Sequence, residues 1–377
     1  MAESKLKKSR RSGKIKKEKK VPAKSKTRKK VVVKKRVAAK KVVIKKSALA
    51  LKKSRNNPVI VPESNNSWES KAAFNPSAIY HDGKVHVVYR AIGESDISVL
   101  GYAKSEDGYF FDSHSKKLAY YRRDMPDVSL PNISYVSGGG WGGGSEDPRL
   151  TKIGERIYMI YTAFDGWGSL RIALTSISLA DFISGRFNWR EAVLMSPPGE
   201  IHKNWVLFPE KINGKYAILH SFAPKILIDY FESLDELDGK SFIQSNNTRP
   251  VDESRTWDSW FRGVGPTPIK TKYGWLLIYH GMDHKNPDRY RMGAIILDLQ
   301  DPTKILYRSQ EPILEPEEWY ENNGYKSGVV YACGAVVKDG KLFVYYGGAD
   351  KVSCLATADL DKFLKELMRT GKTKLKK

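Results

Sequence analysis

Residues 77–90 read Ser-Ala-Ile-Tyr-His-Asp-Gly-Lys-Val-His-Val-Val-Tyr-Arg, and the pattern in this stretch indicates the fold class. It consists of a short apolar segment, an Asp-Gly pair and a second segment rich in Val and Tyr. An Asp-Gly pair between two β-prone segments is typical of a tight hairpin turn, because both turn positions favour residues that tolerate positive φ. The stretch therefore predicts two antiparallel strands joined at Gly83.

The same pattern occurs five times along the chain. Its turn glycines, which are spaced 71, 60, 60 and 66 residues apart, are Gly83, Gly154, Gly214, Gly274 and Gly340. A further apolar segment follows each copy, and these segments begin at Leu100, Leu170, Ile226, Tyr290 and Val352. Strand groups repeated at a near-constant period, with hardly any amphipathic helix between them, are typical of propeller blades.

We therefore predict an all-β fold, a five-bladed β-propeller over residues 58–377 with blades of about 64 residues. A short C-terminal helix is expected at residues 362–368. A β-sandwich or two stacked β-domains would also use many short strands, but neither explains five copies in phase. In a propeller the first strand of each blade starts near the central axis, so the residues at these starts should converge on one funnel.

The starts of the five copies carry polar residues that suit a sugar. The corresponding stretches are Phe74-Asn-Pro, Glu146-Asp-Pro-Arg, Phe208-Pro-Glu, Gly265-Pro-Thr-Pro and Ala332-Cys-Gly. Carboxylates, an asparagine and an arginine that converge on one pocket fit a polyhydroxylated ligand better than an apolar one.

Charge is distributed unevenly along the 377 residues. Residues 1–57 hold 25 of the 65 Lys and Arg but only two of the 42 acids, Glu3 and Glu18, whereas the remaining residues hold 40 of each. Such a basic segment with almost no aromatic residues cannot bury enough apolar surface, so we predict a disordered tail over 1–57. Two interpretations stay open: a polyanion contact with DNA, RNA or an anionic membrane, or a solubilising extension. The charge-balanced body gives no charge argument for binding nucleic acid.

Other features bear on location and cofactors. No segment approaches the ~18 consecutive apolar residues of a membrane span. Lysines interrupt the Val-rich N-terminal stretch, so no secretory signal is predicted and a reducing cytoplasm is expected. The two cysteines, Cys333 and Cys354, cannot form a disulfide framework or a zinc site. The seven histidines never fall in ligand spacing with acids or cysteines, so we predict no metal.

Motifs in successive copies resemble glycoside hydrolase family 130. They are the stretches Ser145-Glu-Asp-Pro-Arg-Leu, Leu207-Phe-Pro-Glu-Lys-Ile, Gly274-Trp-Leu-Leu-Ile-Tyr-His-Gly, Gly293-Ala-Ile-Ile-Leu-Asp-Leu-Gln-Asp-Pro and Val344-Tyr-Tyr-Gly-Gly-Ala-Asp. The resemblance runs from about Phe74 to Thr357 and covers none of the tail. That family contains inverting β-mannoside phosphorylases and some β-mannosidases on a five-bladed propeller. The resemblance therefore implies an enzyme that cleaves β-mannosides with inversion.

The resemblance also implies roles for single residues. Asp147, in Glu-Asp-Pro-Arg, corresponds to the family's proton donor, which is thought to act through a sugar hydroxyl. Asp350 corresponds to a ligand for hydroxyls of the cleaved mannose. The other residues implied in the same substrate subsite are Asn75, Arg90, Arg149 and Glu210. From the residues alone, each keeps a structural alternative: turn carboxylates that cap backbone N–H groups, arginines paired with neighbouring acids, and a buried hydrogen-bonded glutamate.

Phosphorolysis requires cationic and hydrogen-bonding groups that hold a phosphate dianion in line. Lys203 and His280 match phosphate-binding positions of the family phosphorylases, although a solvated lysine and a core histidine are the structural alternatives. Ser221 departs from the family pattern, because phosphorylases typically carry Arg after Leu-His. The candidates for the missing cation are Arg171, Arg255 and Arg262. We favour phosphorolysis to mannose 1-phosphate, with inorganic phosphate as co-substrate and no cofactor.

Two other functions stay open at this stage. An inverting β-mannosidase needs a second carboxylate as base, about 6.5–9.5 Å from the acid. The candidate bases are Glu210, Asp258 and Asp283. A non-catalytic glycan-binding propeller with a nucleic-acid-tethering tail is the third possibility, and the joint presence of Asp147, Lys203 and His280 speaks against it.

The stretch 121–144 differs in character from the motifs around it. Its glycine-rich run, residues 138–144, lacks the Lys and Ser/Thr of a P-loop. We expect a rim loop over the funnel, in which Trp141 could stack on a sugar ring. A homo-oligomer is common in the resembled family, but no sequence feature sets a stoichiometry.

Overall fold

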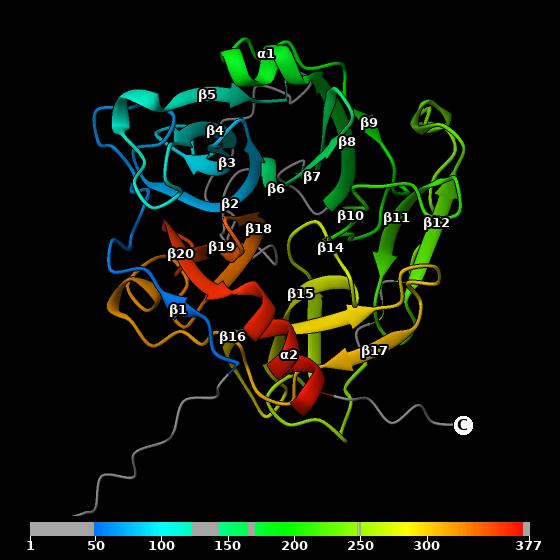
Figure 1. Cartoon of the computed structure of the whole chain (residues 1–377). Helices are drawn as coiled ribbons and strands as arrows, with labels where there is room; N and C mark the ends of the chain where they lie inside the picture. The colour runs from blue at the N-terminus through cyan, green and yellow to red at the C-terminus, as the bar shows by residue number, and fades with distance from the viewer. Residues whose placement is uncertain (1–48, 123–142, 165–169, 247, 249, 372–377) are drawn as a thin grey trace, which may run out of the picture. The chain divides into compact units, whose positions relative to one another are not determined.

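The computed structural model describes residues 49–122, 143–164, 170–246, 248 and 250–371 (Figure 1). The rim loop and Trp141 fall largely outside these residues. Within the described part the secondary structure is almost entirely β, with two short α-helices. The structure confirms the predicted all-β fold.

Five groups of antiparallel strands follow one another along the chain. The first holds β2 (Ala72–His81), β3 (Lys84–Ile92), β4 (Ser98–Ser105) and β5 (Lys117–Tyr120). The second holds β6 (Gly144–Ile153), β7 (Arg156–Phe164), β8 (Leu170–Ser178) and β9 (Val193–Leu194). The third holds β10 (Val206–Leu207), β11 (Tyr216–Ser221) and β12 (Leu227–Phe231). The fourth holds β13 (Trp260–Val264), β14 (Ile269–Thr271), β15 (Gly274–Asp283), β16 (Asn286–Leu297) and β17 (Ile305–Arg308). The fifth holds β18 (Val330–Lys338), β19 (Lys341–Gly348) and β20 (Val352–Asp359).

All five predicted hairpins are present, one in each group. In the first, His81 pairs with Lys84 across the turn, and Asp82 and Gly83 have φ of 47° and 76°. Two positive φ values in succession define the turn that matches the twist of a β-hairpin, which explains the Asp-Gly pair. The first and second groups belong to one sheet, because Ser98 of β4 pairs in parallel with Gly144 of β6.

Hydrogen bonds near the starts of the repeat copies link strand groups to one another. The backbone N–H of Leu150 in β6 donates to Ser77 Oγ in β2 at 2.8 Å. The hydroxyls of Thr151 and Thr267 are 2.9 Å apart, which links the second group to the start of the fourth. Apolar side chains of neighbouring groups fill the space between them, as in the cluster that includes Trp275 and Phe208. The starts of the first two copies thereby lie next to each other.

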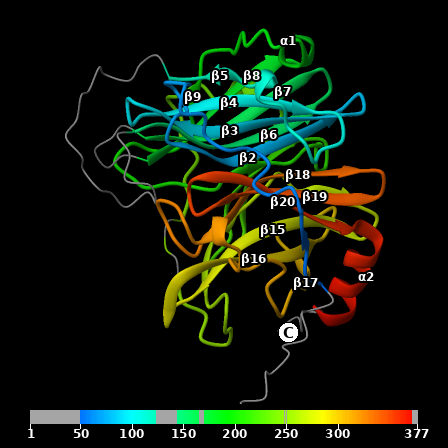
Figure 2. The ribbon, with the colours of Figure 1, turned by 90° about the vertical axis from the view of Figure 1, so that its left-hand side faces the viewer.

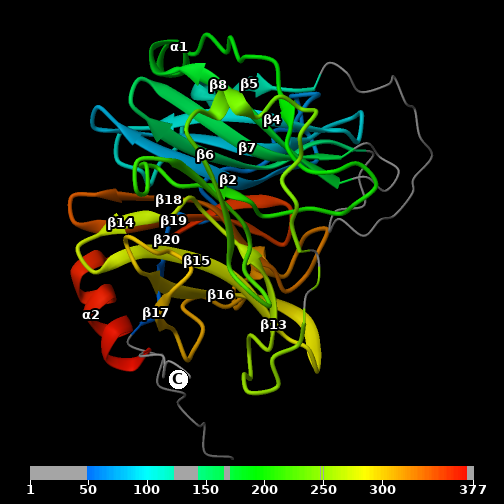
Figure 3. The same cartoon turned by 90° about the vertical axis from the view of Figure 1, so that its right-hand side faces the viewer.

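The predicted C-terminal helix is α2 (Leu360–Thr370), which begins two residues before the expected position. Asp359 caps its first turn by accepting the N–H of Lys362. The helix lies beside β17 (Figure 3), where the N–H of Arg308 donates to the carbonyl oxygen of Gly371 at 2.7 Å. A second helix, α1 (Leu179–Ser184), follows β8. None of the described helices is long and apolar enough to span a bilayer.

Residues 49–57 belong to the folded body, although the sequence assigns them to the basic tail. β1 (Lys52–Lys53) pairs with β20 as the fourth strand of the last sheet (Figure 2). The Asn57 side chain exchanges two hydrogen bonds with the backbone of Leu355. The boundary therefore lies before Leu49 rather than after Asn57, and the order of residues 1–48 lies outside the described part.

A buried ion pair explains why the charge count misplaced this boundary. The Lys53 side chain is only 12% exposed, and its Nζ is 2.5 Å from Oε2 of the fully buried Glu321. The same ammonium donates to the carbonyl oxygen of Glu315 at 2.9 Å. A count of charges treats Lys53 as solvated, whereas a partner 268 residues away neutralises it.

The Lys53–Glu321 pair predicts that Lys53 contributes more to the stability of the fold than its neighbour Lys52. Lys53→Met should lower the free energy of unfolding by roughly 3–5 kcal/mol, because it leaves the Glu321 carboxylate buried without its cation. Lys52→Met is the control, since Lys52 is exposed, and its effect should stay below about 0.5 kcal/mol. Urea unfolding of both variants measures the difference. Equal stabilities would mean that Lys53 does not anchor the segment.

Candidate functional site

Asn75 and Asp147 occupy equivalent β-bulges in the first two groups. The pairing of β2 with β3 shifts between Phe74 and Ser77, and that of β6 with β7 shifts between Glu146 and Arg149. Both residues are left-handed, with φ of 50° and 49°, a conformation that Asn and Asp tolerate better than other side chains. A bulge re-aims one side chain, and here it directs the two residues toward each other. Asn75 Nδ2 donates to Asp147 Oδ1 at 2.8 Å.

Asp147 is buried among cations. It is 4% exposed, and Arg90 Nη1 lies 3.5 Å from its Oδ1. Burial alone would raise the pKa of this carboxyl, but Lys203, Arg90 and the hydrogen bond from Asn75 together lower it below its usual range. Asp147 is therefore ionised at neutral pH in the ligand-free protein.

Glu146 lies next to Asp147 and pairs with two cations. Its Oε1 accepts from Arg90 Nη2 at 2.8 Å, and its Oε2 lies 3.2 Å from Lys203 Nζ. Arg90 also donates to Ser98 Oγ at 2.9 Å, so its guanidinium is fixed on several sides. Positive and negative charges alternate along this buried chain.

Arg149 supports the main chain of the bulge. Its Nη1 donates to the carbonyl oxygen of Asp147 at 3.0 Å, and its Nε donates to that of Gly265 at 2.9 Å. A third bond, 2.7 Å from Nη2 to Asn204 Oδ1, joins it to the loop before β10. Arg149 is buried and ties three groups together without lining the cavity described next.

A cavity of about 700 Å³ opens above these residues. Five of the predicted site residues line it, and they are Asn75, Arg90, Asp147, Lys203 and Asp350. Asp350 follows Ala349 in a turn where both residues have positive φ, at 50° and 52°. Burial raises the pKa of the Asp350 carboxyl to about 7, against the opposing effects of Lys326 and Arg90.

The structure does not bring Glu210 or His280 to this cavity. The Glu210 side chain is 51% exposed and pairs with Lys270 on the surface. His280 is fully buried, accepts the N–H of Ala332 at Nε2 over 2.9 Å, and stacks on the Tyr331 ring. Burial and the nearby Arg149 lower the pKa of His280 to about 3, so its ring is neutral.

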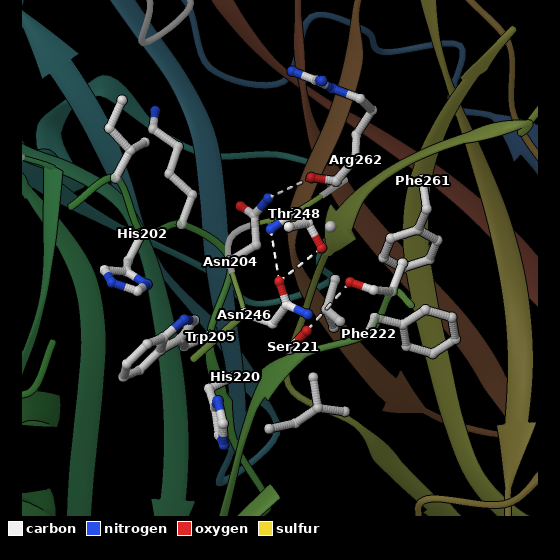
Figure 4. A pocket seen from close by; sticks show the side chains of 16 residues that line it. His202, Asn204, Trp205, His220, Ser221, Phe222, Asn246, Thr248, Phe261 and Arg262 are labelled. Atoms are coloured by element: carbon white, nitrogen blue, oxygen red, sulfur yellow. Dashed lines mark hydrogen bonds between the residues drawn. The ribbon is translucent and has the colours of Figure 1, made fainter. Parts of the chain in front are cut away.

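A second, smaller cavity of about 60 Å³ adjoins the first (Figure 4). The two share Ile201, Lys203, Asn204 and Arg262. The smaller one is also lined by polar side chains, namely His220, Ser221, Asn246 and Thr248. Its volume and its donors fit a small hydrophilic group rather than a sugar ring.

Arg262 is the one candidate for the missing cation that lines both cavities in the described part. Its guanidinium lies 4.2 Å from the centre of the Trp260 ring, and its Nε donates to the Tyr290 hydroxyl at 3.0 Å. Arg255 is held by two bonds of 2.7 Å to Asp258 instead. Arg171 donates to the carbonyl oxygen of Ser196 at 2.9 Å.

The three candidate bases for hydrolysis lie outside the cavity. Asp258 is buried in a network with Arg255, Arg308 and Tyr279. Asp283 ends β15, and Glu210 is on the surface as described above. The carboxylate that sequence reasoning missed is Glu200, which lines the cavity and lies 2.7 Å from His202 Nε2.

Several other lining residues also escaped sequence reasoning. They are Asn204, Trp260, Tyr290, Lys326 and Tyr331. Asn204 could have been found, because it follows Lys203 in the motif His-Lys-Asn-Trp. Lys326 had no such signal, since its place depends on a 3.1 Å bond from its backbone N–H to the carbonyl oxygen of Ala349. Among the described residues, no cluster of three metal-ligating side chains occurs.

Comparisons with known proteins agree on one family. The sequence profile of glycoside hydrolase family 130, described as beta-1,4-mannooligosaccharide phosphorylase, matches residues 33–369. The chain is 41% identical over 323 residues to a 1,2-beta-oligomannan phosphorylase of Thermoanaerobacter sp. (strain X514), covering 83% of this chain and 98% of the relative. A beta-1,2-mannobiose phosphorylase of the same organism is 36% identical over 328 residues, with the same coverage.

A solved structure shares the fold at moderate identity. It is the beta-1,2-mannobiose phosphorylase of Listeria innocua in complex with beta-1,2-mannobiose. The TM-score is 0.63 at 27% identity, and the match covers 84% of this chain and 99% of that one.

The raised pKa of Asp350 predicts that the stability difference between Asp350→Asn and the wild type depends on pH. Its carboxyl ionises near pH 4 when unfolded but near pH 7 when folded, so the folded protein binds more protons between these values and loses stability as pH rises. Asp350→Asn removes this penalty and should melt higher than the wild type at pH 8, with the gap closing toward pH 4. The gain can reach a few kcal/mol, since one pKa unit corresponds to about 1.4 kcal/mol.

Asp339→Asn is the matched control for this measurement. Asp339 also has a positive φ, 50°, but its side chain is 77% exposed. Its melting difference from the wild type should change little between pH 5 and pH 8. The same flat profile for Asp350→Asn would contradict the role assigned to burial.

Proposed function

This chain belongs to glycoside hydrolase family 130, and from that premise we propose that it is a phosphorylase of β-1,2-linked mannooligosaccharides that releases mannose 1-phosphate. It is an enzyme that acts on β-mannosides, with inorganic phosphate as co-substrate. The observation that carries the proposal is the junction of a sugar-sized cavity with a small cationic one beside Asp147. The β-1,2 linkage is favoured because the relatives at 41% and 36% identity carry it in their names, whereas a named beta-1,4 relative from Ruminococcus albus is 27% identical.

In this proposal Asp147 is the proton donor. A phosphate oxygen attacks the anomeric carbon, the glycosidic C–O bond breaks, and the leaving oxygen takes the proton of Asp147 through a sugar hydroxyl. Lys203 is the largest of the charges that lower the pKa of Asp147 in the ligand-free protein. Phosphate bound against Lys203 offsets that charge and raises the pKa of Asp147 again. Binding of the nucleophile therefore favours the protonated acid that the reaction needs.

The smaller cavity is the proposed phosphate site. Lys203 and Arg262 supply positive charge at its junction with the larger cavity, and Ser221 contributes a hydroxyl. Arg262 would supply the cation expected at position 221, and its contacts with Trp260 and Tyr290 hold the guanidinium in place. The neutral, buried His280 would support the wall through Tyr331 rather than contact phosphate. Asn75, Arg90 and Asp350 would bind the mannose unit that is cleaved.

We also propose that the five strand groups are the blades of a five-bladed propeller. Each group contains one repeat copy, and hydrogen bonds near the copy starts link the second group to the first and to the fourth. Cytoplasmic location, a homo-oligomer and polyanion contact through the basic tail remain predictions. The excess of Lys and Arg in residues 1–48 supports the last of them.

Product analysis tests the proposed function. The full chain is incubated with β-1,2-mannobiose or β-1,4-mannobiose, with and without inorganic phosphate. Mannose 1-phosphate formed from the β-1,2 substrate only with phosphate is the expected result. Free mannose at equal rates in both conditions would establish an inverting β-mannosidase instead. Binding without any product would favour a glycan-binding module.

Asp147→Asn should lower phosphorolysis by about 10²–10⁴-fold, because the amide cannot donate the acid proton. The rate of mannose 1-phosphate release measures this loss. Calorimetric titration with β-1,2-mannobiose should show that the variant still binds its substrate. Turnover equal to that of the wild type would exclude Asp147 as the acid.

Arg262→Gln should raise the KM for phosphate about 10–100-fold, because a charged hydrogen bond to the dianion is lost. Arg171→Gln is the matched control, since Arg171 lines neither cavity. Initial rates are measured against phosphate concentration at saturating disaccharide. An unchanged KM in Arg262→Gln would place the phosphate cation elsewhere.

A further inference from the structure

One fully buried carboxylate, Glu146, connects the acid side of the proposed site to its phosphate side. Its Oε1 accepts from Arg90 Nη2 at 2.8 Å, and Arg90 Nη1 lies 3.5 Å from Asp147 Oδ1. Its Oε2 lies 3.2 Å from Lys203 Nζ, at the junction of the two cavities. Four side chains thus form a chain of alternating charge through the wall of the site.

The backbone explains why Glu146 can do this beside Asp147. Glu146 still pairs with Thr162 in the regular ladder of β6 and β7, whereas Asp147 lies in the bulge. A bulge breaks the alternation of side chains along a strand. Neighbouring residues can therefore serve the same site, with Asp147 lining the cavity and Glu146 enclosed behind it.

Lys203 must be held in place if its ammonium is to stay at the cavity junction. Lys203 lies in the loop before β10, and its side chain is 13% exposed at the cavity junction. Lysine carries its charge on a flexible four-carbon chain, and holding it in one place costs side-chain entropy. Arg90 is also fixed by Ser98 and by the Phe74 ring, 5.0 Å from its guanidinium carbon.

We propose that Glu146 is a positioning residue for phosphorolysis, which acts by holding the Lys203 ammonium at the cavity junction where phosphate binds. This inference rests on the proposed function. Glu146 touches neither cavity, so its effect on phosphate passes through Lys203. If Glu146 only balanced charge, Glu146→Gln would lower the KM for phosphate, because removing a negative charge near the site would strengthen the binding of a dianion.

The test is steady-state phosphorolysis of β-1,2-mannobiose by Glu146→Gln. The amide keeps the shape of the side chain but has one oxygen for two cations, so one of them faces an NH₂ group. We expect the KM for phosphate to rise about 10–100-fold, the size of one lost charged hydrogen bond. The KM for mannobiose should change less than about threefold. An unchanged or lower KM for phosphate would overturn the inference.

A double-mutant cycle shows whether the effect passes through Lys203. In the Lys203→Met background, adding Glu146→Gln should change the KM for phosphate by less than about twofold, because the group to be positioned is gone. Independent, multiplicative effects of the two substitutions would overturn the inference. Calorimetric titration with inorganic phosphate alone gives a second readout that needs no turnover.

Glu69→Gln controls for the cost of removing a buried carboxylate. Glu69 is also fully buried, accepts from Tyr89 at 2.7 Å and pairs with Lys116 at 3.3 Å, but it lines neither cavity. It should lower the melting temperature without moving the KM for phosphate. If Glu146→Gln fails to fold, Glu146→Asp keeps the charge but shortens the reach, and the same rise in KM is expected.

The outcomes separate this inference from the proposed function. A wild-type protein that forms no mannose 1-phosphate refutes the phosphorylase proposal, and the inference with it. Phosphorolysis by the wild type, combined with a phosphate KM that Glu146→Gln leaves unchanged or lowers, refutes the inference alone.

Discussion

The site depends on a single constraint, which is that charges removed from water must be paired. Asp147, Arg90, Glu146 and Lys203 are all largely buried, and each lies next to a group of opposite charge. A chain of this kind is costly to break at any point, because the remaining charges lose their compensation. Strands from the first two groups and the loop before the third must therefore keep their relative positions. The charges of the proposed site therefore also fix the architecture around them.

Some of the residues with left-handed backbone lie at the proposed site, while others, such as Asp82 and Asp339, lie in hairpin turns. Asn75, Asp147 and Asp350 all have positive φ, and each lines the main cavity. Non-glycine residues in this region are tolerated where the surrounding structure fixes them. Arg149 provides such fixation, since it donates to the carbonyl oxygens of Asp147, Val264 and Gly265. Asp350 carries a second cost, because burial raises the pKa of its carboxyl to about 7 and so disfavours its charged form in the folded protein.

Sequence reasoning found residues at the copy starts and in family motifs, including Lys203, which lies in a loop. It missed Trp260, Tyr290 and Tyr331, which lie on strands but in no such motif. Asn75 and Asp147 were predictable because they occupy equivalent positions at the starts of the first two copies. His280 was chosen on the resemblance alone, and the structure buries it as a neutral ring behind Tyr331. Glu210 starts the third copy, but its side chain is half exposed and pairs with Lys270 on the surface. Lys326 depends on a loop contact that leaves no local pattern.

The periodic features of this protein could be predicted from local sequence patterns. Asp-Gly and related turns require positive φ wherever they occur, so five hairpins and an all-β fold follow from local chemistry. The tertiary structure alone decided which charges are buried and with what partners, because that depends on residues far apart in the chain. Lys53 and Glu321 show this at the tail boundary, as do Glu146 and Lys203 at the site. Local conformation is encoded by neighbours in sequence, whereas the electrostatics of a site is set by distances that only folding creates.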